Sequence, residues 1–209
     1  MDHTPSILQL LEIRQRKDIE DRVHNFIWEG GIDVGVCDKV VEFYETCTYL
    51  PKVEYDGRDS SIGKVSTDMH CHTMLAKNEE VLNTYLLNLL ECIQTYCRTY
   101  PQAGQLNCHV SPMFNIQRYK PSQGYSTWHY ERGMERINRE RFLVWMTYLS
   151  DNPDGGTEWM YQDKYIPAKK GATVIWPAEW THTHRGVIDK KLEKTIITGW
   201  IDIESGFAI

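Results

Sequence analysis

The sequence has no long hydrophobic run, no excess of positive charge and no paired cysteine motif. None of its apolar stretches approaches the roughly 20 residues that a membrane-spanning helix needs, so we expect no membrane partner. The formal net charge of −6 disfavours a dedicated binder of nucleic acid or of anionic membrane surfaces. The six cysteines contain no CxxC pair, and the N-terminal stretch lacks the features of a signal peptide. We therefore expect a cytoplasmic protein with free thiols.

The chain does contain enough apolar surface for one sizeable core. Hydrophobic residues make up 41% of the 209 residues, which favours a single domain over residues 1–209. The pattern changes along the chain: residues 1–110 are mainly helical in character, and residues 111–205 are rich in short β-type runs. We predict an α+β fold in which the helices support the β half, because the apolar faces of helices need a sheet to cover them.

Three helices are predicted in the first half. One begins near Thr4-Pro5, one covers residues 36–44, and the clearest covers residues 78–101 with Asn78 as its N-cap. Between the second and third helices, residues 54–73 are polar and contain glycine, so we predict a mobile loop there and, from composition, a lid over a pocket formed by residues 50–76.

The second half alternates β-type runs with turn signals. The runs are "MFNIQRY", "GYSTWHYE", "FLVWMTYL", "ATVIWP" and "TIITGWIDI". Several short strands separated by turns, among them one at Gly155-Gly156, are typical of a β-sandwich or a barrel.

Candidate metal ligands occur in two places in this β half. On a strand, His129 and Glu131 would point to the same face because side chains alternate. His182 and His184 follow 53 and 55 residues later, a gap that holds the strands a sheet needs to fold back. Two histidines and one carboxylate on one side of a metal are the ligand set of non-haem Fe(II) oxygenases. By itself, the first pair is equally explained as two ordinary strand residues.

An oxygenase of this kind also needs an electron source. If that source is 2-oxoglutarate, its distal carboxylate needs a cation, and Lys194 opens a strand ten residues after His184. On that strand Lys194, Thr198 and Trp200 share a face, so the Thr198 hydroxyl could donate a hydrogen bond beside the ammonium group. Tyr119 offers a third donor one strand and turn before His129.

These segments, in this order, resemble the 2-oxoglutarate- and Fe(II)-dependent oxygenases, in their prolyl 4-hydroxylase-like branch. The resemblance covers residues 113–203, with a weaker likeness in the helical half. It is carried by four stretches: "QRYKPSQGYSTWHYE", "RFLVWMTYLSDNPDGGTEW", "IPAKKGATVIWPAEWTHTHRG" and "KTIITGW". Each stretch alone is a weak signal, whereas the ordered series is specific.

The resemblance implies a fold, a reaction and a set of site residues. The fold would be a double-stranded β-helix, or jelly roll, with helices outside. The reaction would be hydroxylation of a substrate C–H bond, in a peptidyl proline or a small molecule, with release of succinate and CO2. The cofactors would be Fe(II), 2-oxoglutarate and O2, with ascorbate as an accessory reductant. Iron would bind His129, Glu131 and His184, and the cosubstrate would bind the residues Lys194, Tyr119, Thr198 and Trp200.

The chain departs from the family pattern at two points. The carboxylate is Glu131 where aspartate is commoner, and we expect a shifted backbone with the metal retained. The distal histidine has two candidates. His184 fits the ten-residue step to Lys194 better than His182, which is the second choice.

Other interpretations use the same residues. A jelly roll that binds metal without turnover, as a sensor or scaffold, is one alternative, and a zinc or manganese enzyme on a cupin-like barrel is another. The "HCH" at residues 70–72 lacks the spaced pairs of a closed zinc site. Four arginines follow the dyad, and we interpret them as part of a solvent-exposed connecting segment, with contact to a substrate as the second interpretation. We interpret four aromatic residues as packing residues. The arginines are Arg132, Arg136, Arg139 and Arg141, and the aromatic residues are Trp128, Tyr130, Trp145 and Trp176.

Overall fold

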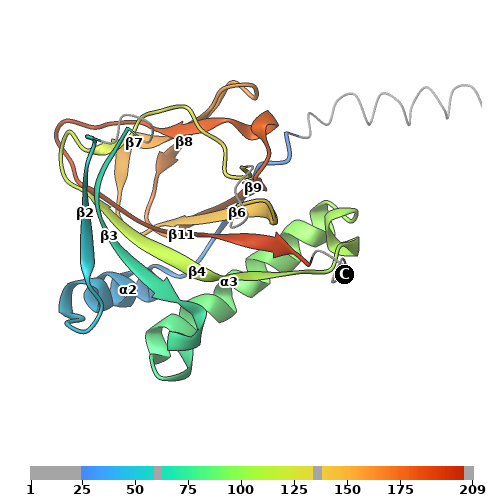
Figure 1. The fold of residues 1–209 in the computed structure, drawn as a ribbon, viewed down its shortest axis with the longest axis horizontal. Helices are drawn as coiled ribbons and strands as arrows, with labels where there is room; N and C mark the ends of the chain where they lie inside the picture. Colours follow the sequence, from blue (N-terminus) through green and yellow to red (C-terminus); the bar gives the residue numbers. More distant parts are fainter. Residues whose placement is uncertain (1–24, 59–62, 134–137, 205–209) are drawn as a thin grey trace, which may run out of the picture.

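Two β-sheets and two α-helices make up the computed structural model of the chain, which describes residues 25–58, 63–133 and 138–204 (Figure 1). The helix predicted near Thr4-Pro5 and the candidate residue Arg136 lie outside these described residues. The helices are α2 (Val34–Thr46) and α3 (Glu80–Thr99), with short 3-10 turns η1 (Thr73–Lys77), η2 (Ala103–Gln105) and η3 (Trp180–His182). The strands are β1 (Trp28–Gly31), β2 (Lys52–Asp56), β3 (Lys64–His72), β4 (Cys108–Tyr119), β5 (Gly124–Tyr125), β6 (Arg141–Tyr148), β7 (Asn152–Trp159), β8 (Lys164–Ala168), β9 (Ala172–Pro177), β10 (His184–Gly186) and β11 (Lys194–Ile203).

The strand order is that of a jelly roll. The larger sheet runs β1-β9-β6-β11-β4-β3-β2, with β5 paired to β3, and the smaller sheet runs β10-β7-β8. All pairs are antiparallel, and neighbours such as β11 and β4 are far apart in sequence. Figure 1 shows β7 and β8 on one side of the larger sheet and both helices on the other. The predicted double-stranded β-helix with helices packed outside is confirmed by this arrangement and by the structural neighbours described below.

The helices cover the outer face of the larger sheet with a continuous apolar layer. Helix α3 buries one side of its cylinder, at the three- and four-residue spacing of an amphipathic helix. Its buried residues are Leu82, Tyr85, Leu89, Cys92 and Tyr96. Tyr85 satisfies its hydroxyl group against the buried Thr147 hydroxyl at 2.8 Å. The helix starts one residue later than predicted, because Glu79 is the N-cap and no side chain, including that of Asn78, caps it.

Residues 50–76 contain a β-hairpin, so the prediction of a mobile loop and lid is wrong. Strand β2 pairs with β3 from Lys52↔Met69 to Asp56↔Val65, and β3 pairs with β4 in turn. The sequence "KVSTDMHCH" does not predict a strand, because most of the inward-facing positions of β3 are polar where apolar residues are expected. The first 110 residues therefore contribute strands to the larger sheet as well as helices to its outer face. No described helix is long and apolar enough to cross a membrane.

Candidate metal and cosubstrate site

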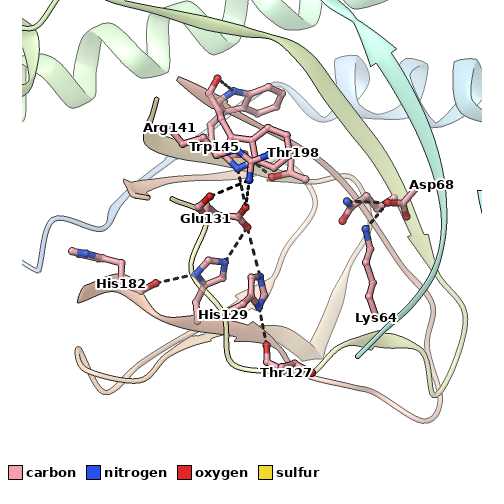
Figure 2. A network of polar contacts seen from close by, with 12 residues as sticks. Lys64, Asp68, Thr127, His129, Glu131, Arg141, Trp145, His182 and Thr198 are labelled. Atoms are coloured by element: carbon pink, nitrogen blue, oxygen red, sulfur yellow. Dashed lines mark hydrogen bonds and ion pairs between the residues drawn. The ribbon is translucent and has the colours of Figure 1, made fainter. Parts of the chain in front are cut away.

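The loop after β5 brings His129 and Glu131 to the strand that carries His184. His129 and His184 form an isolated antiparallel bridge with both backbone hydrogen bonds in place, at 3.0 and 2.9 Å. The Glu131 backbone amide donates a hydrogen bond to the Ala178 carbonyl at 3.1 Å, which holds the backbone at Glu131 in place. One ligand atom from each of the three side chains lies within 4.8 Å of the other two, and within the described part of the chain no other His, Cys, Asp or Glu group forms such a cluster. Figure 2 shows the side chain of His129 pointing toward Glu131.

Backbone carbonyls orient both imidazole rings. His129 Nδ1 lies 2.7 Å from the Thr127 carbonyl, and His184 Nδ1 lies 2.9 Å from the His182 carbonyl (Figure 2). A carbonyl only accepts, so each Nδ1 carries a hydrogen, and in the neutral form of each ring Nε2 keeps a lone pair. The two Nε2 atoms face Glu131 Oε1, at 3.6 Å from His129 and 3.8 Å from His184. This outer hydrogen bonding is the usual way in which proteins aim histidine ligands at a metal.

Glu131 is held as a carboxylate although it is half-buried. Burial opposes ionisation, but the hydrogen bond from His129, the charges of His129 and His184 in their protonated forms, and the charge of Arg141 outweigh it and lower the pKa of Glu131 to about 2. Arg141 donates to Glu131 Oε2 at 2.9 Å, and the Trp200 indole N–H donates to the same oxygen at 3.0 Å. The guanidinium group also lies 3.6 Å from the centre of the Trp200 ring. Oε1 remains directed at the histidines.

The donor set fits a divalent transition metal such as Fe(II). The set consists of two imidazole nitrogens and one carboxylate oxygen, and all three residues line the cavity. Burial lowers the pKa of His184 to about 4, so this ring is neutral, as a metal ligand must be, over the whole physiological range. That these residues hold iron stays a prediction, and the geometry agrees with it.

His182, the second choice for the distal ligand, points away from the cluster. Its Nε2 donates to the Asn25 carbonyl at 2.8 Å, and its Nδ1 accepts from the Thr181 hydroxyl at 3.0 Å. Both ring nitrogens are therefore occupied. His182 contributes its backbone carbonyl, which orients His184.

Lys194 lies in the same cavity as the three candidate ligands. The cavity has a volume of about 150 Å³, and its lining includes His129, Glu131, His184 and Lys194. The Lys194 ammonium group donates to the Gly155 carbonyl and lies 3.3 Å from the Val187 carbonyl. Burial lowers its pKa to about 8, because the charged form has lost most of its water. A buried cation near a metal site is a suitable partner for a carboxylate.

The hydroxyl groups predicted to assist Lys194 are engaged elsewhere. Thr198 and Tyr119 line the cavity, as does Trp200. The Thr198 hydroxyl donates to the Trp145 carbonyl at 2.8 Å, and the Tyr119 hydroxyl donates to Gln117 Oε1 at 2.6 Å. As placed, neither hydroxyl can also donate to a ligand, because each has a single hydrogen. Their role in binding 2-oxoglutarate stays a prediction that requires a rotation of the hydroxyl groups.

Several residues of the site carried no clear signal in the sequence. Arg141 is not part of a solvated connection, because it is paired with Glu131 inside the site. Tyr125 stacks on the His129 ring, with centroids 3.7 Å apart and planes 7° apart. Tyr148 lines the same cavity as Lys194 and could have been found from the alternation of side chains along its strand. Tyr125 directly follows a glycine that indicates a turn, so the sequence does not predict that Tyr125 pairs with β3.

The remaining sequence motifs play other parts. Residues 70–72 do not form a metal site, since Cys71 is buried in the apolar core and His72 is exposed and accepts from the Met74 amide. Trp145 is fully buried as predicted. Trp176 is buried against the cavity. Arg132 pairs with Glu179 at 2.5 Å, at the edge of the site.

The comparisons with known proteins agree with this geometry. The family model of the 2OG-Fe(II) oxygenase superfamily matches residues 114–202. No curated protein matches the sequence. Among solved structures, the chain is similar to a viral collagen prolyl hydroxylase from Paramecium Bursaria Chlorella virus-1, with 16% identity, a TM-score of 0.62, and 85% of this chain and 96% of that chain covered.

Two other prolyl hydroxylases have the same fold. A Pseudomonas putida prolyl-4-hydroxylase matches with 14% identity and a TM-score of 0.63, over 88% of this chain and 96% of that one. A Trichoplax adhaerens prolyl hydroxylase, in complex with a hypoxia inducible factor peptide fragment, matches with 14% identity and a TM-score of 0.61, over 98% and 96%. Residues 114–202 thus match the 2OG-Fe(II) oxygenase superfamily, and the chain has the fold of the prolyl 4-hydroxylase-like branch of these enzymes.

Proposed function

We propose that this protein hydroxylates a C–H bond of a peptidyl proline, using Fe(II), 2-oxoglutarate and O2. The single observation that carries the proposal is that the three candidate ligands and the buried Lys194 line one cavity. A buried lysine beside an apolar wall is costly for a fold, and a carboxylate ligand offsets that cost.

Each residue has a defined part in this proposal. His129, Glu131 and His184 would hold Fe(II) through two Nε2 atoms and one carboxylate oxygen, leaving the cavity side of the metal open. Iron bound there would supply, together with 2-oxoglutarate and O2, the oxidising chemistry that releases succinate and CO2. Lys194 would bind the distal carboxylate of 2-oxoglutarate, and so fix the orientation of the cosubstrate. Arg141 and Trp200 would hold the Glu131 carboxylate in place.

The substrate class is supported by the structural neighbours. The protein from Paramecium Bursaria Chlorella virus-1 is named as a collagen prolyl hydroxylase, and the Trichoplax adhaerens protein was solved with a peptide fragment bound. These likenesses are at the level of fold, so the substrate has to be tested on this chain.

The test is a mass-spectrometric assay with a built-in metal control. The purified protein is incubated with Fe(II), 2-oxoglutarate, ascorbate and a panel of proline-containing peptides, and succinate and peptide masses are measured together. We expect succinate formation coupled to the gain of one oxygen on proline, and loss of both in His129→Ala. Succinate without any modified proline would reject the substrate, and no succinate under any condition would reject the reaction.

A further inference from the structure

The wall of the cavity formed by β3 and β4 is polar, although it lies inside a jelly roll. Lys64, Asn115 and Gln117 line the cavity there, together with Tyr119. Their partners Ser66, Asp68 and His70 occupy alternating inward positions of β3. Apolar residues would fill such positions at less cost, because buried polar groups are tolerated only when they are paired. The contacts of this wall therefore show which of its polar groups remain available to a ligand.

Both carboxylate oxygens of Asp68 are engaged by neighbouring side chains, and Asp68 does not line the cavity. It is fully buried, and its Oδ1 accepts from the Ser66 hydroxyl at 2.7 Å. Its Oδ2 accepts from the Lys64 ammonium group at 2.5 Å and from the Gln117 side-chain amide at 3.1 Å. Figure 2 shows the Lys64–Asp68 pair to one side of Glu131 and His129. The pair is electrically neutral, and the cavity-lining member is the donor Lys64.

Asn115 is turned by His70 so that its amide N–H groups stay available. His70 Nδ1 donates to Asn115 Oδ1 at 2.7 Å, and the Tyr55 hydroxyl donates to His70 Nε2 at 3.3 Å. The oxygen of the Asn115 amide is thus occupied. Within the described ranges, the Asn115 amide nitrogen makes no hydrogen bond to another residue, and Asn115 lines the cavity.

This wall also lies beside the candidate metal ligands. In the β3–β5 pairing Lys64 is opposite Tyr125, whose ring stacks on His129. In the β3–β4–β11 pairing Asn115 lies between His70 and Thr198. A group bound by Lys64 and Asn115 would therefore be held in the same cavity as the metal.

We propose that Lys64 and Asn115 form a substrate-carbonyl site, which holds a neutral amide carbonyl of the substrate by two donated hydrogen bonds. The cavity-lining groups of this wall with hydrogens left to donate are the Lys64 ammonium and the Asn115 amide, so a ligand that uses both supplies an oxygen acceptor. Asp68 already balances the charge of Lys64, so a neutral carbonyl suits the site better than a second carboxylate beside the anionic cosubstrate. The inference rests on the proposed function, and it makes Lys64 and Asn115 determinants of specificity for peptide-linked substrates over free amino acids.

The experiment compares two small probes. Acetyl-Ala-Pro-amide presents a carbonyl after proline, and acetyl-Ala-Pro with a free C-terminus presents a carboxylate at the same position. Their binding to the protein loaded with Mn(II) and 2-oxoglutarate is measured by calorimetry. We expect the wild-type protein to prefer the amide. Lys64→Met should bind the amide about tenfold more weakly or worse, since a hydrogen bond to a charged donor is lost.

Four variants separate recognition from structure. Lys64→Arg should recover most of the affinity for the amide, because it keeps a charged donor. Asn115→Leu should weaken the amide about fivefold, the effect of one neutral hydrogen bond. Asp68→Asn should shift the preference towards the acid, because the charge of Lys64 is then unbalanced. Lys52→Met removes an exposed lysine from the adjacent strand and should change nothing. Thermal melting and 2-oxoglutarate affinity are recorded for every variant.

The outcomes of this experiment are distinguishable from failure of the proposed function. Equal binding of the amide by wild type and Lys64→Met would overturn the inference, as would an undetectable wild-type affinity for the amide while 2-oxoglutarate is still converted to succinate. A loss of 2-oxoglutarate affinity in Lys64→Met would assign Lys64 to the cosubstrate and also overturn it. Absence of succinate formation by the wild-type protein with every substrate would instead reject the proposed function.

Discussion

The two faces of the larger sheet use the same strands for opposite purposes. On the outer face, Met69, Phe114 and Ile197 are fully buried against α2 and α3. On the inner face, their chain neighbours Asp68, Asn115 and Thr198 carry polar groups in or beside the cavity. Because successive side chains of a strand point to opposite faces, one strand can hold the fold with one set of residues and the site with the other.

This division means that changes on the two faces should have different effects. Removing apolar atoms from the outer face should lower the stability and leave each folded molecule competent to bind ligands. Changing the polar groups of the inner face should alter binding with a smaller effect on the fold. The predictions below test this separation in order of decreasing effect.

The largest effect is expected in the helix that packs on the outer face. Leu89→Ala should lower the free energy of unfolding by about 3 kcal/mol, since a fully buried side chain of α3 is replaced by a cavity. Urea denaturation followed by circular dichroism measures this change. The matched control is Leu87→Ala on the same helix, where the side chain is 55% exposed and the loss should stay within about 0.5 kcal/mol. Equal losses in the two variants would contradict the assigned packing.

The second prediction concerns the anion-binding end of the cavity. Lys194→Met should weaken the binding of 2-oxoglutarate on the order of 100-fold, because the variant removes the buried partner of a carboxylate. Calorimetry with Mn(II) in place of Fe(II) gives the affinity directly. Metal binding should be retained, since Lys194 is not one of the three clustered ligands. An unchanged affinity for 2-oxoglutarate would place the cosubstrate elsewhere.

The third prediction concerns the support of Glu131. Arg141→Leu should weaken metal binding about tenfold, because the variant removes a hydrogen bond that fixes the carboxylate. Competition with a chelator provides the measurement. Arg132→Leu, which removes a pair with Glu179 at the edge of the site, serves as the control and should bind metal normally.

The smallest effect is the pH dependence of 2-oxoglutarate binding. Burial places the pKa of Lys194 at about 8, so the protein loses the ammonium form as the pH rises through that value. The affinity for 2-oxoglutarate should therefore fall about fourfold between pH 7 and pH 8.5, the change in the protonated fraction of a group with this pKa. Lys194→Arg, which stays charged, should remove the dependence. A flat profile in the wild-type protein would contradict the assignment.

The sequence predicts those parts of the site whose chemistry depends on local spacing. His129 and Glu131 share a face, and Lys194, Thr198 and Trp200 line the cavity together, as the alternation of a strand requires. The family resemblance is supported by the matched segment and by the fold. The choice of His184 over His182 agrees with the structure, because the carbonyl of His182 orients the ring of His184.

Features that depend on long-range pairing could not be predicted. Strand β3 reads as a loop because Lys64, Ser66 and Asp68 occupy inward positions where a hydrophobic pattern is expected. Their pairing involves Gln117 on β4, which is 49 residues from Asp68. Similarly, the sequence predicts that Arg141 is a surface residue, whereas the fold pairs it with Glu131. Hydroxyl directions, such as that of Thr198, follow from neighbouring carbonyls and not from the strand pattern.

The most direct test of the account is whether the two late histidines differ in their effect on metal and cosubstrate binding. Fe(II) and 2-oxoglutarate are added without oxygen to the wild-type protein, to His184→Ala and to His182→Ala, and the visible charge-transfer absorption is recorded. We predict an absorption band in the wild-type protein and in folded His182→Ala, and its loss in His184→Ala. A band that persists in His184→Ala would contradict the proposed metal site.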